Sequence, residues 1–369
     1  MKILHLLYES KGDYFGMGGV AVRAYEIYSR LKDRHEITLL CRNYPHAPAA
    51  NEGYINGLRH IYVGMGGTNF TVALLSYAYE ASRFVRRYGE GYDVIVEDFS
   101  PAVPTSLCLY NRRPVVLQIQ GYTGSMYFRK YNLLKAGVLY LLERALPSLY
   151  RHVIAVSETS LRRYRVSKGA LKAVIPNGID DRLLKIPTGN EAYILYLGRI
   201  DVHHKGIDVL LEAYRRLCLN YSIPLLIAGD FRDKGKFYDI YNRLPERVRG
   251  LIRLTGWVDS HQKYELLQDA LMVVMPSRYE TQGIVALEAM ASARPLVVSD
   301  IPELGYVVEQ GAGISFSPAD AGALCEAMEA MIQGSERRAM GERGRAWVKS
   351  FTWDEIALQF EAHLQRTLA

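Results

Sequence analysis

Cysteine and tryptophan are scarce in this sequence. Its 369 residues include 4 cysteines and 3 tryptophans, and the cysteines lie far apart without forming a C-x-x-C pair. This spacing argues against a zinc knuckle and against a disulfide framework, so we expect free thiols in a reducing cytoplasm. A D-x-D motif and clustered His and Asp residues are also missing, and the sequence therefore predicts no metal ion and no other cofactor.

A convincing membrane-spanning run is missing as well. The longest stretch without Asp, Glu, Lys or Arg, residues 60–79, has about the length of a membrane span, but three glycines, Thr68 and Asn69 interrupt it. The first residues, MKILHLLYESKGDY, hold too few apolar side chains before Glu9 for a signal peptide. They predict a first buried strand instead, and the expected location is cytoplasmic.

Charge is divided unevenly along the chain. Residues 1–185 carry 25 Lys and Arg against 15 Asp and Glu, whereas residues 186–369 carry 20 against 24. The basic first half indicates either an acidic partner or a solvated basic surface. Nucleic acid is not expected as that partner because no base-stacking motif accompanies the basic residues, although 27 tyrosines are present.

Short apolar runs rich in Val, Ile and Leu alternate with helical patterns through both halves. Runs without strict alternation are typical of parallel strands that are buried on both faces. The sequence therefore predicts an α/β protein with two doubly wound domains. The expected strands are residues 2–8, 36–41, 93–98, 114–120 and 152–157 in the first half, and 193–198, 224–229, 252–256, 271–276 and 295–300 in the second.

A polar stretch with proline and glycine, residues 180–192, marks the expected domain boundary. The predicted domains are residues 1–185 and 186–353, and the last helix, 354–369, is expected to pack back across the hinge. Two such domains imply a cleft. Ligands of doubly wound sheets bind beyond the carboxyl ends of the strands, and every candidate residue considered next lies at such an end.

A glycine-rich loop precedes the first predicted helix. Residues 16–21, GMGGVA, formally satisfy the G-x-G-x-x-A fingerprint of dinucleotide sites. Residues 9–15 separate them from the first strand, however, and Cys41 and Arg42 stand where an acidic ribose ligand is expected. These departures disfavour NAD(P). A simple turn, or backbone amides that meet a phosphate or a sugar, remain open.

Arg199 and Lys205 lie in one loop between the first strand and the first helix of the second half. A guanidinium and an ammonium beside a helix N-terminus can hold a diphosphate. The alternative is a solvated basic loop.

The stretch ETQGIVALEAM, residues 280–290, follows a buried strand and opens a helix. Free N–H groups near Gly283 can receive an anion, and Glu280 and Glu288 can reach one ligand from different heights. A glycosidase pair must flank the scissile bond with its carboxylates about 5–10 Å apart. Two glutamates on one loop-helix junction are poorly placed to do so, and a glycosidase is therefore disfavoured. A helix-terminal Glu280 and a solvent-facing Glu288 are the structural alternative.

Together these stretches resemble the retaining nucleotide-sugar glycosyltransferases of the GT-B fold, family four, which include glycogen-synthase-like and mannosyltransferase-like members. The resemblance implies two Rossmann-like domains that face each other across a cleft, the first for the acceptor and the second for the donor. It rests on GMGGVAVRAYEI (16–27), VSETS (156–160), IPNGIDD (175–181), LGRIDVHHKGIDVLLEAY (197–214), IAGD (227–230), LTGWV (254–258) and PSRYETQGIVALEAMASARPLVVSD (276–300).

Carried over to this sequence, the resemblance assigns catalytic roles to Arg199 and Lys205 on the donor diphosphate and to Glu280 on the transferred sugar. Glu288 would bind the ribose hydroxyls. Further donor contacts are implied for the backbone amides of Gly18, Gly19, Gly283, Ile284 and Val285, for the side chain of Gln120, and for the backbone near Val258 beside the base.

Two positions depart from the family pattern. Gln120 stands where members usually have histidine, and a glutamine can bond a sugar hydroxyl but cannot become a cation. Ala293 stands where members generally have glycine, which we interpret as a packing difference.

The expected activity is therefore metal-independent, retaining transfer of a hexose-type sugar from a UDP-, GDP- or ADP-sugar to a glycan or a lipid-linked acceptor. The alternatives are a sugar-nucleotide epimerase or phosphorylase on the same fold and a non-catalytic nucleotide-sugar binder.

Residues 127–172 hold ten Lys and Arg and two acids, interleaved with aromatic residues and an apolar run. Such a segment is typical of a basic amphipathic helix that contacts an anionic membrane. Peripheral binding at the inner membrane face is thus one expectation, and an ordinary helix with its apolar face in the core is the other.

Overall fold

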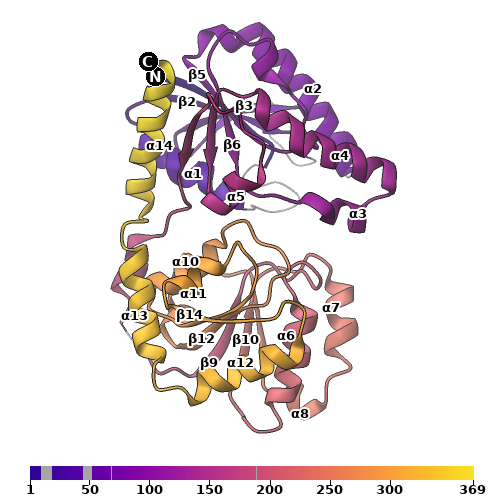
Figure 1. Ribbon diagram of the computed structural model, residues 1–369, viewed down its shortest axis with the longest axis vertical. Helices are drawn as coiled ribbons and strands as arrows, with labels where there is room; N and C mark the ends of the chain where they lie inside the picture. The colour runs from indigo at the N-terminus through magenta and orange to yellow at the C-terminus, as the bar shows by residue number, and fades with distance from the viewer. Residues whose placement is uncertain (10–18, 45–51, 68, 188) are drawn as a thin grey trace. The chain divides into compact units, whose positions relative to one another are not determined.

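The computed structural model describes residues 1–9, 19–44, 52–67, 69–187 and 189–369 (Figure 1). They form two compact units. The first unit combines Met1–Gly178 with Trp353–Ala369, and the second is Ile179–Thr352. Each unit is built on a sheet of mainly parallel strands with helices packed on it, as the alternating pattern predicted.

The sheet of the first unit has the order β3-β4-β2-β1-β5-β6-β7-β8 within the described residues, and only the β3–β4 pair is antiparallel. β1 lies near its centre with every residue after Lys2 buried. Its strands are β1 (Lys2–Leu7), β2 (Glu36–Arg42), β3 (Glu52–Ile55), β4 (Leu58–Val63), β5 (Val94–Asp98), β6 (Val115–Ile119), β7 (His152–Ala155) and β8 (Leu171–Val174).

The hairpin of β3 and β4 was not among the predicted strands. Asn56 and Gly57 connect the two strands with positive φ angles of 52° and 81°. Both signs suit a two-residue type I′ turn, for which Asn-Gly is the preferred sequence. The signal was therefore present in the sequence, although the strands are short and half exposed.

The C-terminal helix α14 belongs to the first unit, where it packs against α1 (Figure 1). At Gly178, a Cβ atom would lie 2.5 Å from the Trp353 ring, so only glycine fits there. The main segment of the first unit runs to Gly178, whereas the sequence analysis placed the domain boundary at residue 185. Its helices are α1 (Gly19–Leu31), α2 (Phe70–Tyr88), α3 (Tyr127–Lys130), α4 (Leu133–Ala145), α5 (Glu158–Arg163) and α14 (Trp353–Leu368).

The sheet of the second unit is parallel throughout its described strands, in the order β11-β10-β9-β12-β13-β14. All six residues of β12 are buried, which explains its unbroken apolar sequence. The strands are β9 (Tyr193–Leu197), β10 (Leu225–Ala228), β11 (Ile252–Gly256), β12 (Ala270–Met275), β13 (Leu296–Ser299) and β14 (Gly313–Phe316).

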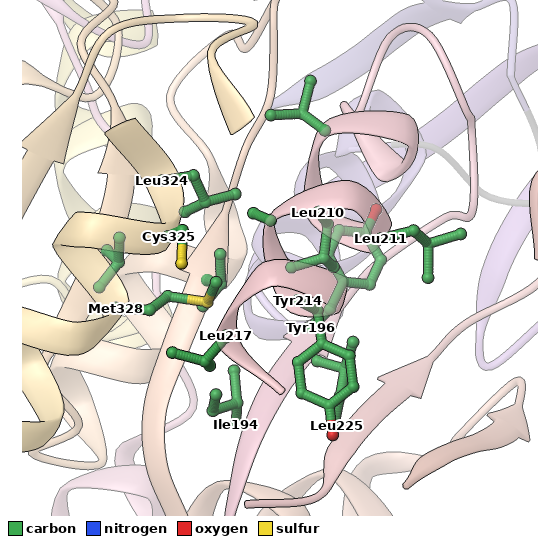
Figure 2. Packing of buried hydrophobic residues seen from close by; sticks show 14 of the residues in the cluster. Ile194, Tyr196, Leu210, Leu211, Tyr214, Leu217, Leu225, Leu324, Cys325 and Met328 are labelled. Carbon is green, nitrogen blue, oxygen red and sulfur yellow. The ribbon is translucent and has the colours of Figure 1, made fainter. Parts of the chain in front are cut away.

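Helix α6 anchors one face of this sheet. Its buried side chains share one apolar cluster with those of α12, in which Leu217 lies beside Met328 (Figure 2). This packing fixes the start of α6, and with it the loop from β9. The helices of the second unit are α6 (Ile207–Leu217), α7 (Lys234–Tyr241), α8 (Glu246–Arg249), α9 (Ser260–Gln268), α10 (Ile284–Ala291), α11 (Gly305–Glu309), α12 (Ala321–Gln333) and α13 (Arg337–Val348).

Candidate functional site

Two loops of the second unit carry the predicted catalytic residues. They are the β9–α6 loop, residues 198–206, and the β12–α10 loop, residues 276–283. The loops are neighbours because β9 and β12 pair in parallel, so their carboxyl ends meet at one edge of the sheet. The backbones touch at Gly206, where a Cβ atom would lie 2.0 Å from the carbonyl oxygen of Pro276.

Lys205 and Glu280 form an ion pair across these loops. Nζ of Lys205 lies 2.5 Å from Oε1 of Glu280, and the hydroxyl of Ser277 donates to the same oxygen over 2.8 Å. The Glu280 side chain is 7% exposed and that of Lys205 is 25% exposed. Lys205 uses one of its three ammonium hydrogens here. The other two make no hydrogen bond to the described residues and are available to a ligand.

The negative charge of Glu280 is felt by a neighbouring buried phenol. Burial raises the pKa of Tyr306, and the charge of Glu280 raises it further. The Tyr306 hydroxyl stays protonated and donates to the carbonyl oxygen of Gln282 over 2.6 Å. This bond fixes the backbone just before α10.

The N-terminus of α10 offers amides. Gly283 takes a left-handed φ of 70°, and the first amides with acceptors in the helix are those of Ala286 and Leu287, which both bond the carbonyl oxygen of Gly283. The amides of Ile284 and Val285 precede them and have no acceptor among the described residues. Such free N–H groups favour an anion.

Arg199 follows Gly198 at the end of β9. Its side chain is exposed, and its guanidinium makes no hydrogen bond or ion pair with the part of the chain that the structure describes. The backbone, in contrast, is fixed, because the Tyr196 hydroxyl donates to the Arg199 carbonyl over 2.8 Å. Arg199 therefore carries a cation that no described residue engages, on a held backbone in the same loop that presents Lys205.

Glu288 has a partner that the sequence did not indicate. Nζ of Lys263 in α9 lies 2.5 Å from its Oε1, and the Glu288 side chain is 11% exposed. Asp259 and Gln262 form a capping box that starts α9 and so sets which face carries Lys263. That box, D-x-x-Q, indicates where α9 starts but not which residue Lys263 contacts.

The two residues that follow β11, Trp257 and Val258, differ in burial. Trp257 is 68% exposed, whereas Val258 is half-buried and packs against the cluster that also receives Val285. The backbone near Val258 was predicted to border the base, and this stays a prediction.

In the first unit, Gln120 donates from Nε2 to Oδ1 of Asp98 over 2.8 Å. The same oxygen accepts a hydrogen bond of 2.7 Å from Gln118, and Oδ2 lies 2.9 Å from Nε2 of His5. A carboxylate only accepts, so the amide nitrogen of Gln120 must face Asp98. Its amide oxygen accepts no hydrogen bond from the described residues.

Arg23 completes this buried network. It donates from Nε to Oε1 of Gln118 over 3.1 Å and to the carbonyl oxygens of Ile175 and Pro176. Burial lowers its pKa to about 10, and the charge of Asp98 opposes that change, so the guanidinium is charged at neutral pH. Sequence reasoning selected Gln120 but missed Arg23, Asp98 and the rest of its support.

The remaining predicted donor contacts are the backbone at Gly18 and Gly19. Gly19 is the first residue of α1, and Gly18 lies outside the described residues. Among the described residues, no three His, Cys, Asp or Glu side chains gather as metal ligands. No helix in the described ranges has both the length and the apolar character to cross a membrane.

Two family models match consecutive parts of the chain. The model described as Glycosyltransferase Family 4 matches residues 17–183, and the model described as Glycosyl transferases group 1 matches residues 184–347. The chain belongs to the family 4 glycosyltransferases. The resemblance to family four inferred from the sequence motifs is thereby confirmed.

Relatives of this glycosyltransferase include a glycogen synthase of Mycobacterium tuberculosis, 34% identical over 193 residues. That match covers 50% of this chain and 46% of the relative, about half of its length. A phosphatidyl-myo-inositol mannosyltransferase of the same species is 26% identical and covers 93% of this chain and 91% of the relative.

A solved structure shows the same fold. The HepE protein of Anabaena, in complex with UDP and glucose, has a TM-score of 0.73 at 18% identity and covers 99% of this chain and 100% of that chain. The architecture of the chain is therefore the GT-B fold.

Proposed function

We propose that this glycosyltransferase moves a hexose from a nucleoside diphosphate sugar to an acceptor with retention of anomeric configuration. The observation that carries the proposal is the gathering, in two touching loops, of the Lys205–Glu280 ion pair and the free amides that open α10. Arg199, in the same loop as Lys205, adds a cation that has no ion pair among the described residues. Cations and amides of this kind match a diphosphate, and a carboxylate matches sugar hydroxyls.

The chemistry follows from where charge develops. As the bond between the anomeric carbon and the diphosphate oxygen breaks, negative charge grows on the departing phosphate. Arg199, Lys205 and the α10 amides stabilise that charge more than the ground state. The acceptor oxygen bonds the anomeric carbon on the same face, and its proton goes to a phosphate oxygen. This scheme requires neither a metal ion nor an enzymic base.

Glu280 and Glu288 then have separate tasks in donor binding. Glu280, held by Lys205 and Ser277, accepts hydrogen bonds from hydroxyls of the transferred sugar. Glu288 accepts those of the ribose. The contacts inferred for Gly18, Gly19 and Val258 stay predictions from the resemblance.

Gln120 narrows the choice of sugar. One N–H of its amide is bonded to Asp98, so it offers a ligand its amide oxygen and its second N–H. A sugar hydroxyl can donate to that oxygen, whereas a carboxylate cannot and would also be repelled by Asp98. We therefore expect neutral hexoses rather than uronic acids. UDP is the first nucleotide to test because HepE binds it.

A lipid-linked acceptor is the part of the proposal that concerns residues 127–172. Helix α4 leaves Leu134 81% exposed and Leu141 66% exposed, and α3 leaves Phe128 44% exposed. Lys135 and Arg144 lie on α4. Apolar side chains among cations suit the interface of an anionic bilayer, and one relative is named as a phosphatidyl-myo-inositol mannosyltransferase.

Vesicle sedimentation tests this membrane contact. We expect the protein to bind anionic vesicles at low salt, and Leu134→Ser with Leu141→Ser to abolish binding. Leu219→Ser in the second unit is the matched control, because Leu219 is 63% exposed but far along the chain from α4. No binding by the wild type, or equal loss in the control, would remove the membrane contact.

Donor turnover tests the activity itself. The protein is incubated with UDP-, GDP- and ADP-hexoses, and release of the nucleoside diphosphate is measured with and without glycan or lipid acceptors. We expect one donor to be consumed, EDTA to leave the rate unchanged, and NMR of the product to show the donor's anomeric configuration. Binding without release of any nucleoside diphosphate would favour a non-catalytic binder.

A further inference from the structure

Arg278 of the β12–α10 loop makes two hydrogen bonds to the β9–α6 loop and two to helix α6. Its backbone N–H donates to the carbonyl oxygen of His204 over 3.0 Å, and its Nη1 donates to the carbonyl oxygen of His203 over 2.8 Å. Nη1 and Nη2 also donate to the two carboxylate oxygens of Asp208, each over 2.8 Å. One residue of the β12–α10 loop therefore bonds the β9–α6 loop and the first turn of α6.

The residues that Arg278 joins are close neighbours, along the chain, of Lys205 and Glu280. His204 precedes Lys205 directly, and Glu280 follows Arg278 by two residues. Between them, the rings of His204 and Tyr279 stack with centroids 5.1 Å apart. Movement of either loop relative to the other would break these contacts together.

The contacts of the Arg278 side chain indicate a structural role and not a contact with the donor. Its guanidinium is 17% exposed and is already engaged by a carboxylate and a carbonyl. The arrangement with Asp208 is the two-pronged one that arginine alone can make. Arg199, in contrast, is exposed and makes no such bond to any residue that the structure describes. The two arginines of this site thus have different tasks.

We propose that Arg278 and Asp208 are a positioning pair, which fixes the Lys205 ammonium and the Glu280 carboxylate at the spacing that the donor requires. The inference rests on the proposed function. Lysine is a flexible side chain, and electrostatic stabilisation depends on groups held within about 0.5 Å of the productive geometry. Holding both loops from the side lets Lys205 meet the diphosphate without a prior loop rearrangement, which strengthens binding.

The test compares this pair with a matched pair on the same helix. Arg215 also forms a two-pronged ion pair, with Glu212, at 2.8 Å for each bond. It links residues of α6 to each other and not one loop to another. Arg278→Met and Asp208→Asn are compared with Arg215→Met and Glu212→Gln. Calorimetry gives the Kd for UDP, GDP and ADP, and donor turnover gives kcat and KM.

We expect Arg278→Met and Asp208→Asn each to raise the Kd of the bound nucleoside diphosphate about tenfold and to lower kcat, and the double variant to add little. The Arg215 and Glu212 variants should leave Kd and kcat within twofold. Thermal unfolding shows whether each protein is folded. Arg278→Lys keeps the charge but loses the two-pronged bond, so it should give a Kd between those of the wild type and Arg278→Met. This variant tests the proposal if Arg278→Met does not fold.

The outcomes separate the two proposals. A wild type that binds none of the three nucleotides would overturn the proposed function and this inference with it. A wild type that binds one of them, with a Kd unchanged in folded Arg278→Met or Arg278→Lys, would overturn the positioning pair alone. An equal rise in Kd for the Arg215 variants would show a general loss of helix stability and would equally overturn it.

Discussion

Lys263 and Glu288 form an ion pair of 2.5 Å between α9 and α10, and this pair repeats the arrangement of Lys205 and Glu280. Both glutamates of the 280–290 stretch thus face a lysine that comes from another element of the second unit. The lysines keep the carboxylate oxygens in place. Two held acceptors on one loop-helix segment can bind two parts of an extended ligand.

Substitution of the two glutamates should separate their roles. Glu288→Gln removes an acceptor from the proposed ribose contact, so we expect donor KM to rise about 10- to 100-fold, the effect of losing one hydrogen bond to a charged group. Glu280→Gln should mainly lower kcat. Steady-state kinetics with the identified donor measures both. The reverse pattern would mean that the roles are exchanged.

Arg199 and Lys205 should differ in their effect on stability but not on turnover. Loss of either cation removes a donor to the developing charge, which costs about 3–4 kcal/mol of transition-state stabilisation. We expect Arg199→Ala to keep the wild-type melting temperature because the side chain is exposed and forms no ion pair with the described residues. Lys205→Ala should lower it, since Glu280 is then buried without its cation. Turnover within twofold of the wild type in either variant would contradict the assignment.

The proximity of the two catalytic loops could be predicted from the sequence because it follows from the parallel pairing of their strands alone. Arg199, Lys205 and Glu280 all follow apolar runs, and loops at the carboxyl ends of parallel strands share one edge of a sheet. Lys263 could not be found this way. It lies on the side of a helix, and its contact with Glu288 depends on how α9 packs, which no local pattern specifies.

Besides the β3–β4 hairpin, two strands that escaped prediction are short. Leu171–Val174 and Gly313–Phe316 have four residues each and lie at sheet edges, so neither forms a long apolar run. The support of Gln120 was missed for another reason. Asp98 and Gln120 end neighbouring strands, but only the observed β5–β6 pairing brings their side chains together.

The interpretation of Ala293 as a packing difference was wrong, because the backbone decides this position. Ala293 has a left-handed φ of 52°. Its N–H donates to the carbonyl oxygen of Met290, and that of Arg294 donates to the carbonyl oxygen of Ala289. These two bonds are the Schellman motif, which ends helices most readily with glycine. The motif explains why glycine suits this site.

Ala293→Gly should therefore stabilise the protein. Relief of the left-handed backbone is worth roughly 1–2 kcal/mol, and the greater freedom of glycine in the unfolded chain offsets about half of it. We expect a net gain of about 1 kcal/mol in the free energy of urea unfolding. Ala291→Gly, inside the last turn of α10, is the control and should cost about 1 kcal/mol. A loss in both variants would mean that the Ala293 methyl group matters more than its backbone.

Glu97 gives the first unit a pH dependence whose sign can be worked out. The residue is buried in β5, where it accepts hydrogen bonds from Thr105 and from Tyr150. Burial raises its pKa from 4.5 to about 7, against the effect of these two donors. Between these values the unfolded chain releases the proton while the folded protein keeps it. Rising pH therefore favours unfolding until the pKa of the folded protein is reached.

Glu97→Gln should remove this dependence. The free energy of unfolding of the wild type, relative to the variant, should fall by about 3 kcal/mol from pH 4.5 to pH 7 and stay level above it. Denaturant midpoints at half-unit steps of pH measure the difference. His363 also contributes to stability changes in this pH range, because burial lowers its pKa from 6.5 to about 4. Its contribution has the opposite sign and cancels in the comparison, since both proteins carry it. Parallel curves for the two proteins would show that Glu97 does not hold its proton near neutral pH.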